Sequence, residues 1–257
     1  MRDKILSRLK QIEELEHVRV LFACESGSRA WGFPSQDSDF DVRFVYARPR
    51  DWYLSIEDRR DVIELPLDGS LDVSGWDLRK ALRLFRQSNP PLLEWLRSPI
   101  VYLDSHRVAQ RLRDLVPVYF SPKSCLHHYL HMAQGNYRAY LQGEQVHLKK
   151  YFYVLRPVLA CRWIEATNTM PPTEFQALVD TQVKDLQLRR GIDSLLERKV
   201  RGEELDRGSR IQSINDFLEA EIARLTDYVQ TIERPGLAPT DQLDQLFRDT
   251  LTDVQPA

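Results

Sequence analysis

Three aspartates have the neighbours and the spacing of a metal-binding site. Asp39 and Asp41 alternate with apolar residues in the segment DFDVRFVY, and Asp72 lies in a second apolar-Asp-apolar stretch. Successive side chains of a strand point to opposite faces, so Asp39 and Asp41 are expected to project from the same face, close enough to share a cation. Two like charges side by side are unfavourable unless positive charge lies between them. The pattern therefore predicts a cation site on a strand.

Carboxylate oxygens suit Mg²⁺ or Mn²⁺, which keep water and substrate phosphates among their ligands. If a neighbouring strand brings Asp72 beside Asp39 and Asp41, the three carboxylates can hold two ions about 4 Å apart, the geometry of in-line phosphoryl transfer. One ion would activate an attacking hydroxyl, and the other would neutralise the departing pyrophosphate. Asp72 is the carboxylate best placed to help deprotonate that hydroxyl.

A turn of small residues precedes the acidic pair. Gly27 and Ser28 follow the apolar run VRVLFAC, and ten residues separate them from Asp39. Backbone N–H groups of such a turn can approach a phosphate closely, and the serine hydroxyl adds a donor. Chance rarely matches this combination of strand, Gly-Ser turn, Asp-x-Asp and later apolar-Asp-apolar, although each part alone is weak evidence.

Two arginines lie near these residues. Arg29 follows the turn directly, and it either reaches the nucleotide or lies exposed on the surface. Arg43 shares the carboxylate face of its strand, where it either contacts phosphate or offsets the negative charge. The sequence leaves both alternatives open.

The elements that must position these residues are short strands and amphipathic helices. Apolar spacing predicts helices over residues 3–16, 77–89 and 91–98 and strands over 18–24, 39–46, 62–67 and 71–77. Beyond about residue 105 every pattern is helical. The fold class is therefore expected to be α+β, with a short mixed sheet and flanking helices over 1–105, an all-helical domain over 106–233, and a loosely attached tail over 234–257.

Composition narrows the possible partners. The chain has 257 residues, 42% of them hydrophobic, and a net charge of −2, so a local patch rather than a global cationic field must bind any phosphate. No segment has the apolar length of a signal peptide or a membrane span, so we expect a cytoplasmic protein with no membrane partner. Three cysteines, Cys24, Cys125 and Cys161, are expected to be buried apolar side chains with no disulfide-linked partner.

Several segments resemble a known family: GSRAWGF, DSDFDVRFVY, LDVSGWDLRKALRLF, NPPLLEWLRSPIVY and, in the helical region, KKYFYVLRPVLACRWIE. They are similar to the DNA polymerase β-type nucleotidyltransferase superfamily and, within it, to the YcgL/RlaP-like group associated with RNA repair. The resemblance implies a polymerase β-like nucleotidyltransferase domain followed by a helical domain. It also implies that Gly27 and Ser28 grip a triphosphate and that Asp39, Asp41 and Asp72 bind two divalent ions.

The same resemblance makes Lys149, Lys150 and Tyr153 candidates for holding the triphosphate or base, although lysines on helices are mostly solvated. The implied reaction moves a nucleoside monophosphate from an NTP such as ATP to an acceptor hydroxyl. Arginines in residues 77–88 and 189–201 favour an RNA 3′ end as acceptor, whereas the overall acidity opposes it. The alternatives are a protein acceptor, as in AMP-transferring antitoxins, and a catalytically silent nucleotide-binding module.

Overall fold

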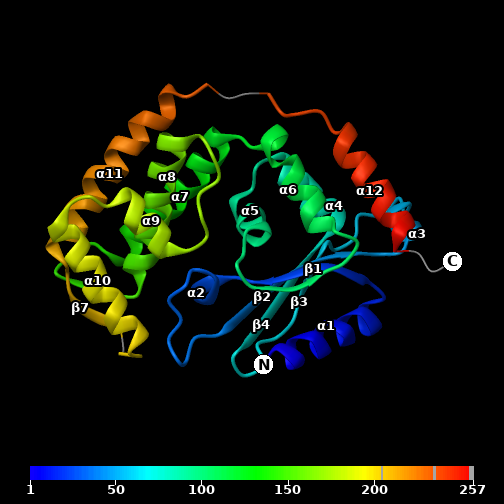
Figure 1. Cartoon of the computed structure of the whole chain (residues 1–257), viewed down its shortest axis with the longest axis horizontal. Helices are drawn as coiled ribbons and strands as arrows, with labels where there is room; N and C mark the ends of the chain where they lie inside the picture. Colours follow the sequence, from blue (N-terminus) through cyan, green and yellow to red (C-terminus); the bar gives the residue numbers. More distant parts are fainter. Residues whose placement is uncertain (204, 234–235, 255–257) are drawn as a thin grey trace. The chain divides into compact units, whose positions relative to one another are not determined.

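The computed structural model describes residues 1–203, 205–233 and 236–254. The chain forms two units, and each is assembled from separate stretches of sequence (Figure 1). The first unit comprises residues 1–30, 39–120 and 237 onwards, and the second comprises residues 31–38 and 121–236.

A five-stranded mixed sheet forms the centre of the first unit. Its strand order is β3 (Val62–Glu64), β4 (Leu71–Asp77), β2 (Phe40–Ala47), β1 (Arg19–Glu25) and β5 (Val101–Asp104). Strands β2 and β4 run parallel, whereas the other neighbouring pairs run antiparallel. The four predicted strands are confirmed, with β3 shorter than expected because Pro66 cannot donate to a ladder. The sequence did not predict β5.

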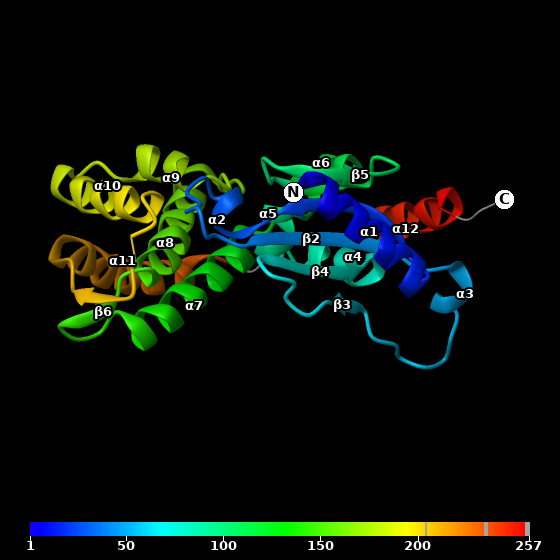
Figure 2. The same cartoon turned by 90° about the horizontal axis from the view of Figure 1, so that it is seen from below.

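The two faces of β2 have different neighbours. Val42, Phe44 and Tyr46 are fully buried and pack against the apolar side of α1 (Arg2–Glu16). Figures 1 and 2 show α1 lying across this face of the sheet. On the opposite face lie α4 (Leu78–Arg86), α5 (Pro90–Leu96) and α6 (Val108–Tyr119) (Figure 1). The predicted alternation of apolar and charged side chains therefore holds over residues 41–44, beyond which Val45 and Ala47 are buried on the side that carries Asp41 and Arg43.

A buried polar chain ties the segment after β2 to α4. Asp77 is fully buried, and its side chain caps α4 by accepting the Arg79 N–H at 2.8 Å. The hydroxyl of Tyr53, in α3 (Arg50–Tyr53), donates to the same carboxylate at 2.8 Å. It also accepts the Arg48 N–H at 3.0 Å. Burial raises the pKa of Asp77, so these donors matter for keeping the carboxylate charged.

We expect Tyr53→Phe to lower the free energy of unfolding by about 1–3 kcal/mol, because a buried carboxylate loses a donor and a backbone N–H loses its acceptor. Urea denaturation of the purified variant measures the change. Tyr140→Phe is the matched control, since Tyr140 is 36% exposed. Equal stability of the two variants would contradict the role of the hydroxyl.

The second unit is helical apart from one small sheet. Its helices are α7 (Pro122–Tyr140), α8 (Lys150–Thr167), α9 (Phe175–Gln182), α10 (Leu186–Val200) and α11 (Gln212–Thr231). Strands β6 (Gln145–His147) and β7 (Arg207–Ser209) pair antiparallel, which corrects the expectation of helices alone. They are three residues each, too short to give a readable strand period.

The unit boundaries differ from the predicted ones at residues 105 and 233. Helix α6 belongs to the first unit, and residues 31–38 belong to the second. The predicted loose tail contains α12 (Asp241–Asp253), which also belongs to the first unit. Its Asp249 pairs with Arg111 of α6 at 2.8 Å. Helix α12 buries Leu243, Leu246, Thr250 and Leu251.

Residues 234, 235 and 255–257 of the predicted tail lie outside the described residues. Within the described parts of the chain, no helix is both long enough and apolar enough to cross a lipid bilayer. The predicted burial of Cys24, Cys125 and Cys161 is confirmed.

Candidate active site

The Gly27–Ser28 turn and the Asp41 carboxylate meet where β1 ends. Gly27 has a φ of +57° and begins the short helix α2 (Gly27–Ala30). A Cβ atom at this position would lie 2.0 Å from Asp41 Oδ2, so any larger residue requires the Asp41 carboxylate or the turn to shift. Ser26, just before the turn, donates its N–H to the Asp41 carbonyl at 2.8 Å. Two features that lie far apart in the sequence are therefore in direct contact.

Asp41 and Asp72 lie side by side on parallel strands. The register of β2 and β4 pairs these two residues directly. The Arg43 guanidinium donates to Asp41 Oδ1 at 3.1 Å and to Asp72 Oδ2 at 2.8 Å. The side chain of Asp41 is 27% exposed and that of Asp72 is 40% exposed, so a ligand from solvent can reach both. Asp72 is thus on the same face of the sheet as Asp41.

Asp39 does not join this pair. It precedes the first residue of β2 and is exposed, which corrects the predicted strand start by one residue. Arg29 holds its backbone, donating from Nε to the Asp39 carbonyl at 3.0 Å, while the guanidinium stacks 3.6 Å from the Phe40 ring centre. Among the described residues, no three or more His, Cys, Asp or Glu side chains are grouped closely enough to hold a metal ion.

The pair of carboxylates nonetheless has the chemistry of a divalent cation site. Asp41 and Asp72 offer oxygen ligands in a half-exposed position, as Mg²⁺ and Mn²⁺ require. Neighbouring carboxylates repel unless a positive charge lies between them, and Arg43 supplies that charge here. Arg43 thus already meets the need for positive charge that the sequence pattern assigned to a cation. What fits a divalent cation here is the set of oxygen ligands offered by two carboxylates, rather than the three-carboxylate cluster expected from the sequence.

Glu25, the last residue of β1, is a further residue at this site that the sequence pattern did not indicate. Its side chain is fully buried, and Oε1 accepts the Asp41 N–H at 2.7 Å. The Tyr102 hydroxyl donates to Oε2. Burial is the main cause that raises the pKa of Glu25, opposed by these two hydrogen bonds. The sequence feature that could have pointed to Glu25 is its place directly after the apolar run VLFAC. A glutamate that continues a buried strand must have partners, because charged residues are rarely fully buried without them.

Residues 31–38, which follow α2 and precede Asp39, are packed within the second unit. The Phe33 ring stacks on Phe152 of α8 with 4.8 Å between ring centres. Lys199 of α10 is 8% exposed and donates to Ser35 Oγ at 3.1 Å. The loop of residues 31–38 is therefore held in place by contacts with α8 and α10.

The three candidate nucleotide-binding residues of the helical domain lie at the start of α8. Lys149 is the exposed N-cap residue of this helix. The Lys150 ammonium lies 4.8 Å from the centre of the Tyr153 ring, and that ring meets Trp31 edge-on at 5.5 Å. Tyr153 is thus brought together with the loop that follows Arg29, within the second unit.

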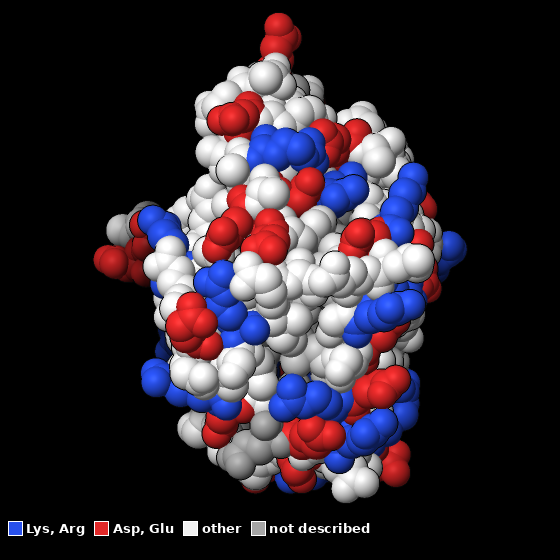
Figure 3. Space-filling view, turned by 90° about the vertical axis from the view of Figure 1, so that its left-hand side faces the viewer, with Lys and Arg blue, Asp and Glu red and all other residues white. Residues whose placement is uncertain are grey.

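The arginines of α10 are largely paired with acidic residues. Arg189 contacts Asp180 at 2.8 Å and Asp193 at 2.9 Å, and Arg198 contacts Glu203 at 2.9 Å. Figure 3 shows basic and acidic side chains interspersed on the face it presents. Acidic side chains therefore compensate the charges of Arg189 and Arg198 on this helix.

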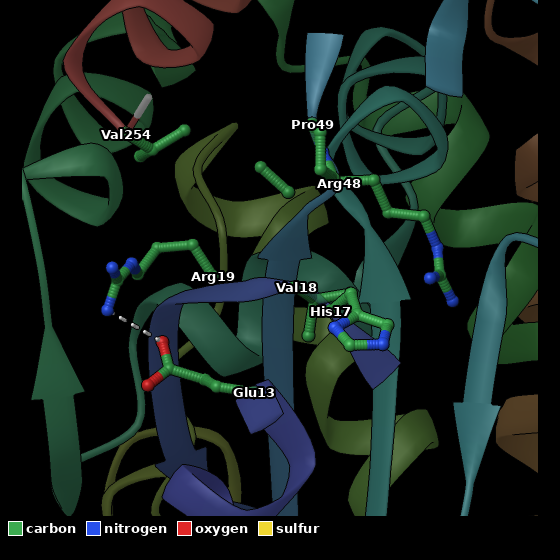
Figure 4. Close-up of a pocket in the computed structure, with 8 residues that line it drawn as sticks. Glu13, His17, Val18, Arg19, Arg48, Pro49 and Val254 are labelled. Atoms are coloured by element: carbon green, nitrogen blue, oxygen red, sulfur yellow. Dashed lines mark ion pairs between the residues drawn. The ribbon is translucent and has the colours of Figure 1, made fainter. Parts of the chain in front are cut away.

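A pocket of about 190 Å³ lies at the opposite end of the same strands (Figure 4). It is lined by Arg19 at the start of β1 and Ala47 at the end of β2, whereas Gly27 and Asp41 lie at the other ends. Arg19 turns toward Glu13, 3.6 Å away, and Arg48 points out of the pocket (Figure 4). The candidate active site and this pocket are separate.

A family model, a relative and a solved structure each match nearly the whole chain. A model of the RNA repair pathway DNA polymerase beta family (RlaP) matches residues 1–249. YcgL of Bacillus subtilis (strain 168), described as an uncharacterized protein, is 50% identical over 254 residues, which is 99% of this chain and 98% of YcgL. A nucleotidyltransferase-like protein from Exiguobacterium sibiricum 255-15 aligns with 98% of this chain and 90% of its own, at 12% identity and a TM-score of 0.33.

Proposed function

Because the chain belongs to the RNA repair pathway DNA polymerase beta family, we propose that it transfers a nucleoside monophosphate from an NTP to an acceptor hydroxyl. The observation that supports this most is the contact of Gly27 with the Asp41 carboxylate. A phosphate held at the turn would lie next to a carboxylate that can bind its counter-ion. Gly27 and Ser28 would hold the triphosphate, with Arg29 beside them.

Asp41 and Asp72 are the residues that would hold Mg²⁺ or Mn²⁺, whereas Asp39 lies outside this pair. When bound, such ions lower the pKa of an attacking hydroxyl and neutralise charge on the leaving pyrophosphate. Arg43 offsets the charge of the two carboxylates, and Asp72 would accept the proton of the acceptor hydroxyl. The chain's contribution is alignment and charge placement rather than covalent chemistry.

In the second unit, Lys149, Lys150 and Tyr153 would contact the nucleotide. Aromatic and ammonium groups together suit a base and a phosphate, and the Lys150 ammonium already lies against the Tyr153 ring.

The acceptor we propose is an RNA 3′ end, which the family's link to RNA repair supports. The purified protein would be incubated with each α-labelled NTP, Mg²⁺ or Mn²⁺, and RNA ending in a 3′ hydroxyl. We expect label on that RNA and none on the same RNA ending in a 3′ phosphate. Parallel incubation with total cell protein tests the other acceptor. Label on protein alone, or nucleotide binding with no transfer, would contradict the proposal.

Arg43→Gln should make the protein's thermal stability more dependent on Mg²⁺. Without the guanidinium, Asp41 and Asp72 repel each other, and only an added cation relieves the repulsion. Differential scanning fluorimetry with and without MgCl₂ should show a larger rise in Tm for this variant than for the wild type. Arg83→Gln, at an exposed position of α4, is the control. A shift equal to that of the control would contradict a cation site at the pair.

A further inference from the structure

The pairing of β1 with β2 ends in a way that redirects one backbone carbonyl. Ser26 donates its N–H to the Asp41 carbonyl at 2.8 Å, as in an ordinary antiparallel ladder. The Ser26 carbonyl instead accepts the Ala30 N–H at 3.4 Å, within the turn of α2. The Asp41 N–H therefore bonds to a side chain where a continued strand would have offered a carbonyl.

That side chain is Glu25, whose Oε1 lies 2.7 Å from the Asp41 nitrogen. Successive N–H groups of a strand point to opposite sides. The Phe40 N–H donates to the Ser70 carbonyl at 2.7 Å, toward β4, so the Asp41 N–H must point toward β1. The Glu25 carboxylate thus takes the place of the Ser26 carbonyl, which bonds within α2 and is not available to the Asp41 N–H.

Glu25 is itself fixed by its neighbours. Its backbone carbonyl accepts the Ser98 hydroxyl at 2.6 Å, and its second carboxylate oxygen accepts the hydroxyl of Tyr102 on β5. The side chain is fully buried, so it cannot touch a substrate. Burying a carboxylate is costly, and an uncharged backbone carbonyl would satisfy the same N–H without that penalty. Stability alone therefore does not explain this residue.

We propose that Glu25 is a positioning residue of the active site. Its carboxylate keeps Asp41 in strand geometry while allowing β1 to leave the sheet early, so that Gly27 can lie against the Asp41 side chain. The effect of Glu25 on turnover rests on the proposed nucleotidyl transfer. Its effect on the backbone of Asp41 is a property of the chain alone and can be measured separately.

Two substitutions of similar volume separate the acceptor from the rest of the side chain. Glu25→Gln keeps an oxygen that can accept the Asp41 N–H, whereas Glu25→Leu removes it. We expect amide hydrogen exchange at Asp41, followed by NMR, to be about 10-fold faster in the leucine variant and close to wild type in the glutamine variant. The leucine variant should lower kcat about 10–100-fold, with a smaller change in KM for the NTP.

Glu13 provides a matched control in the same unit. Its Oε1 accepts the Val20 N–H at 2.8 Å, which is the same kind of bond at the far end of β1. Glu13→Leu should speed exchange at Val20 and leave kcat unchanged. If Glu13→Leu and Glu25→Leu lower kcat equally, the positioning role is refuted.

The remaining outcomes are also decisive. Wild-type exchange at Asp41 in Glu25→Leu would overturn the inference, whatever the activity. Faster exchange at Asp41 in a protein whose wild type transfers no nucleotide would support the positioning role and refute the proposed function instead. If Glu25→Leu does not fold, Tyr102→Phe replaces it, because that variant loosens the carboxylate without removing it. Tyr102→Phe should speed Asp41 exchange about 3-fold, and wild-type exchange would again refute the role.

Discussion

Gly27→Ala should lower kcat/KM for nucleotide transfer by about 1,000-fold. The new methyl group would lie 2.0 Å from Asp41 Oδ2, whereas ordinary contacts begin at 3.4 Å, so the carboxylate or the turn must move by more than 1 Å. A misplacement of about 1 Å near reacting groups costs on the order of 100-fold in rate. Here both proposed halves of the site, the phosphate turn and the cation ligand, are displaced together. Steady-state kinetics with labelled NTP measures the loss.

Gly69→Ala separates backbone strain from this clash. Gly69 has a φ of +62°, close to the +57° of Gly27, but, apart from Gly69 itself and its two chain neighbours, no atom of the described residues lies within 4 Å of the place that a methyl group would take there. Both variants should therefore lose about 1–2 kcal/mol of stability from the left-handed conformation. Only Gly27→Ala should lose activity. Kinetics for Gly27→Ala within about tenfold of Gly69→Ala would show that the contact with Asp41 is irrelevant to function.

Asp41→Asn should lower kcat by about 1,000-fold or more while leaving the protein folded. The substitution keeps the shape of the side chain but removes the charge that would bind a divalent ion, and such ions supply several kcal/mol of transition-state stabilisation. The affinity for Mn²⁺, measured by isothermal titration calorimetry, should fall at least about 10-fold. Removing one of two adjacent carboxylates also relieves repulsion, so the fold should survive.

Asp58→Asn is the control for this experiment, because Asp58 is an exposed aspartate in the segment between β2 and β3. It should retain wild-type turnover and Mn²⁺ affinity. Full turnover by Asp41→Asn would rule out the proposed site. Lost turnover with unchanged Mn²⁺ affinity would mean that Asp41 acts on the substrate rather than on a cation.

Strand periodicity predicted the parts of the site that depend on local geometry. Phe44 and Asp41 point to opposite faces because side chains alternate along any strand, whatever surrounds it. Asp72 could be placed beside Asp41 because both lie in apolar-Asp-apolar stretches, which pair in register when two such strands adjoin. These inferences need only the two-residue alternation of side chains along a strand and one buried face of the sheet.

Features that depend on distant partners could not be predicted in this way. Nothing local to residues 31–38 indicates that Phe33 packs on α8, and nothing local to α12 indicates that Asp249 pairs with Arg111. The role of Glu25 depends on the direction of a single carbonyl, that of Ser26, after the strand ends. Asp39 was placed with Asp41 by counting residues, but β2 begins one residue later than the pattern suggested.

The interleaved composition of the two units has a consequence for biosynthesis. The loop between Ser28 and Asp39 leaves the ribosome more than a hundred residues before α8 and α9, which carry the rings that Phe33 contacts. Helix α12, which completes the first unit, emerges after the whole of the second. The first unit therefore cannot finish folding before the second has been synthesised, and a chain that terminates before α8 cannot seat the loop that joins the turn to the carboxylates. The proposed site therefore cannot form before α8 and α9 have been synthesised.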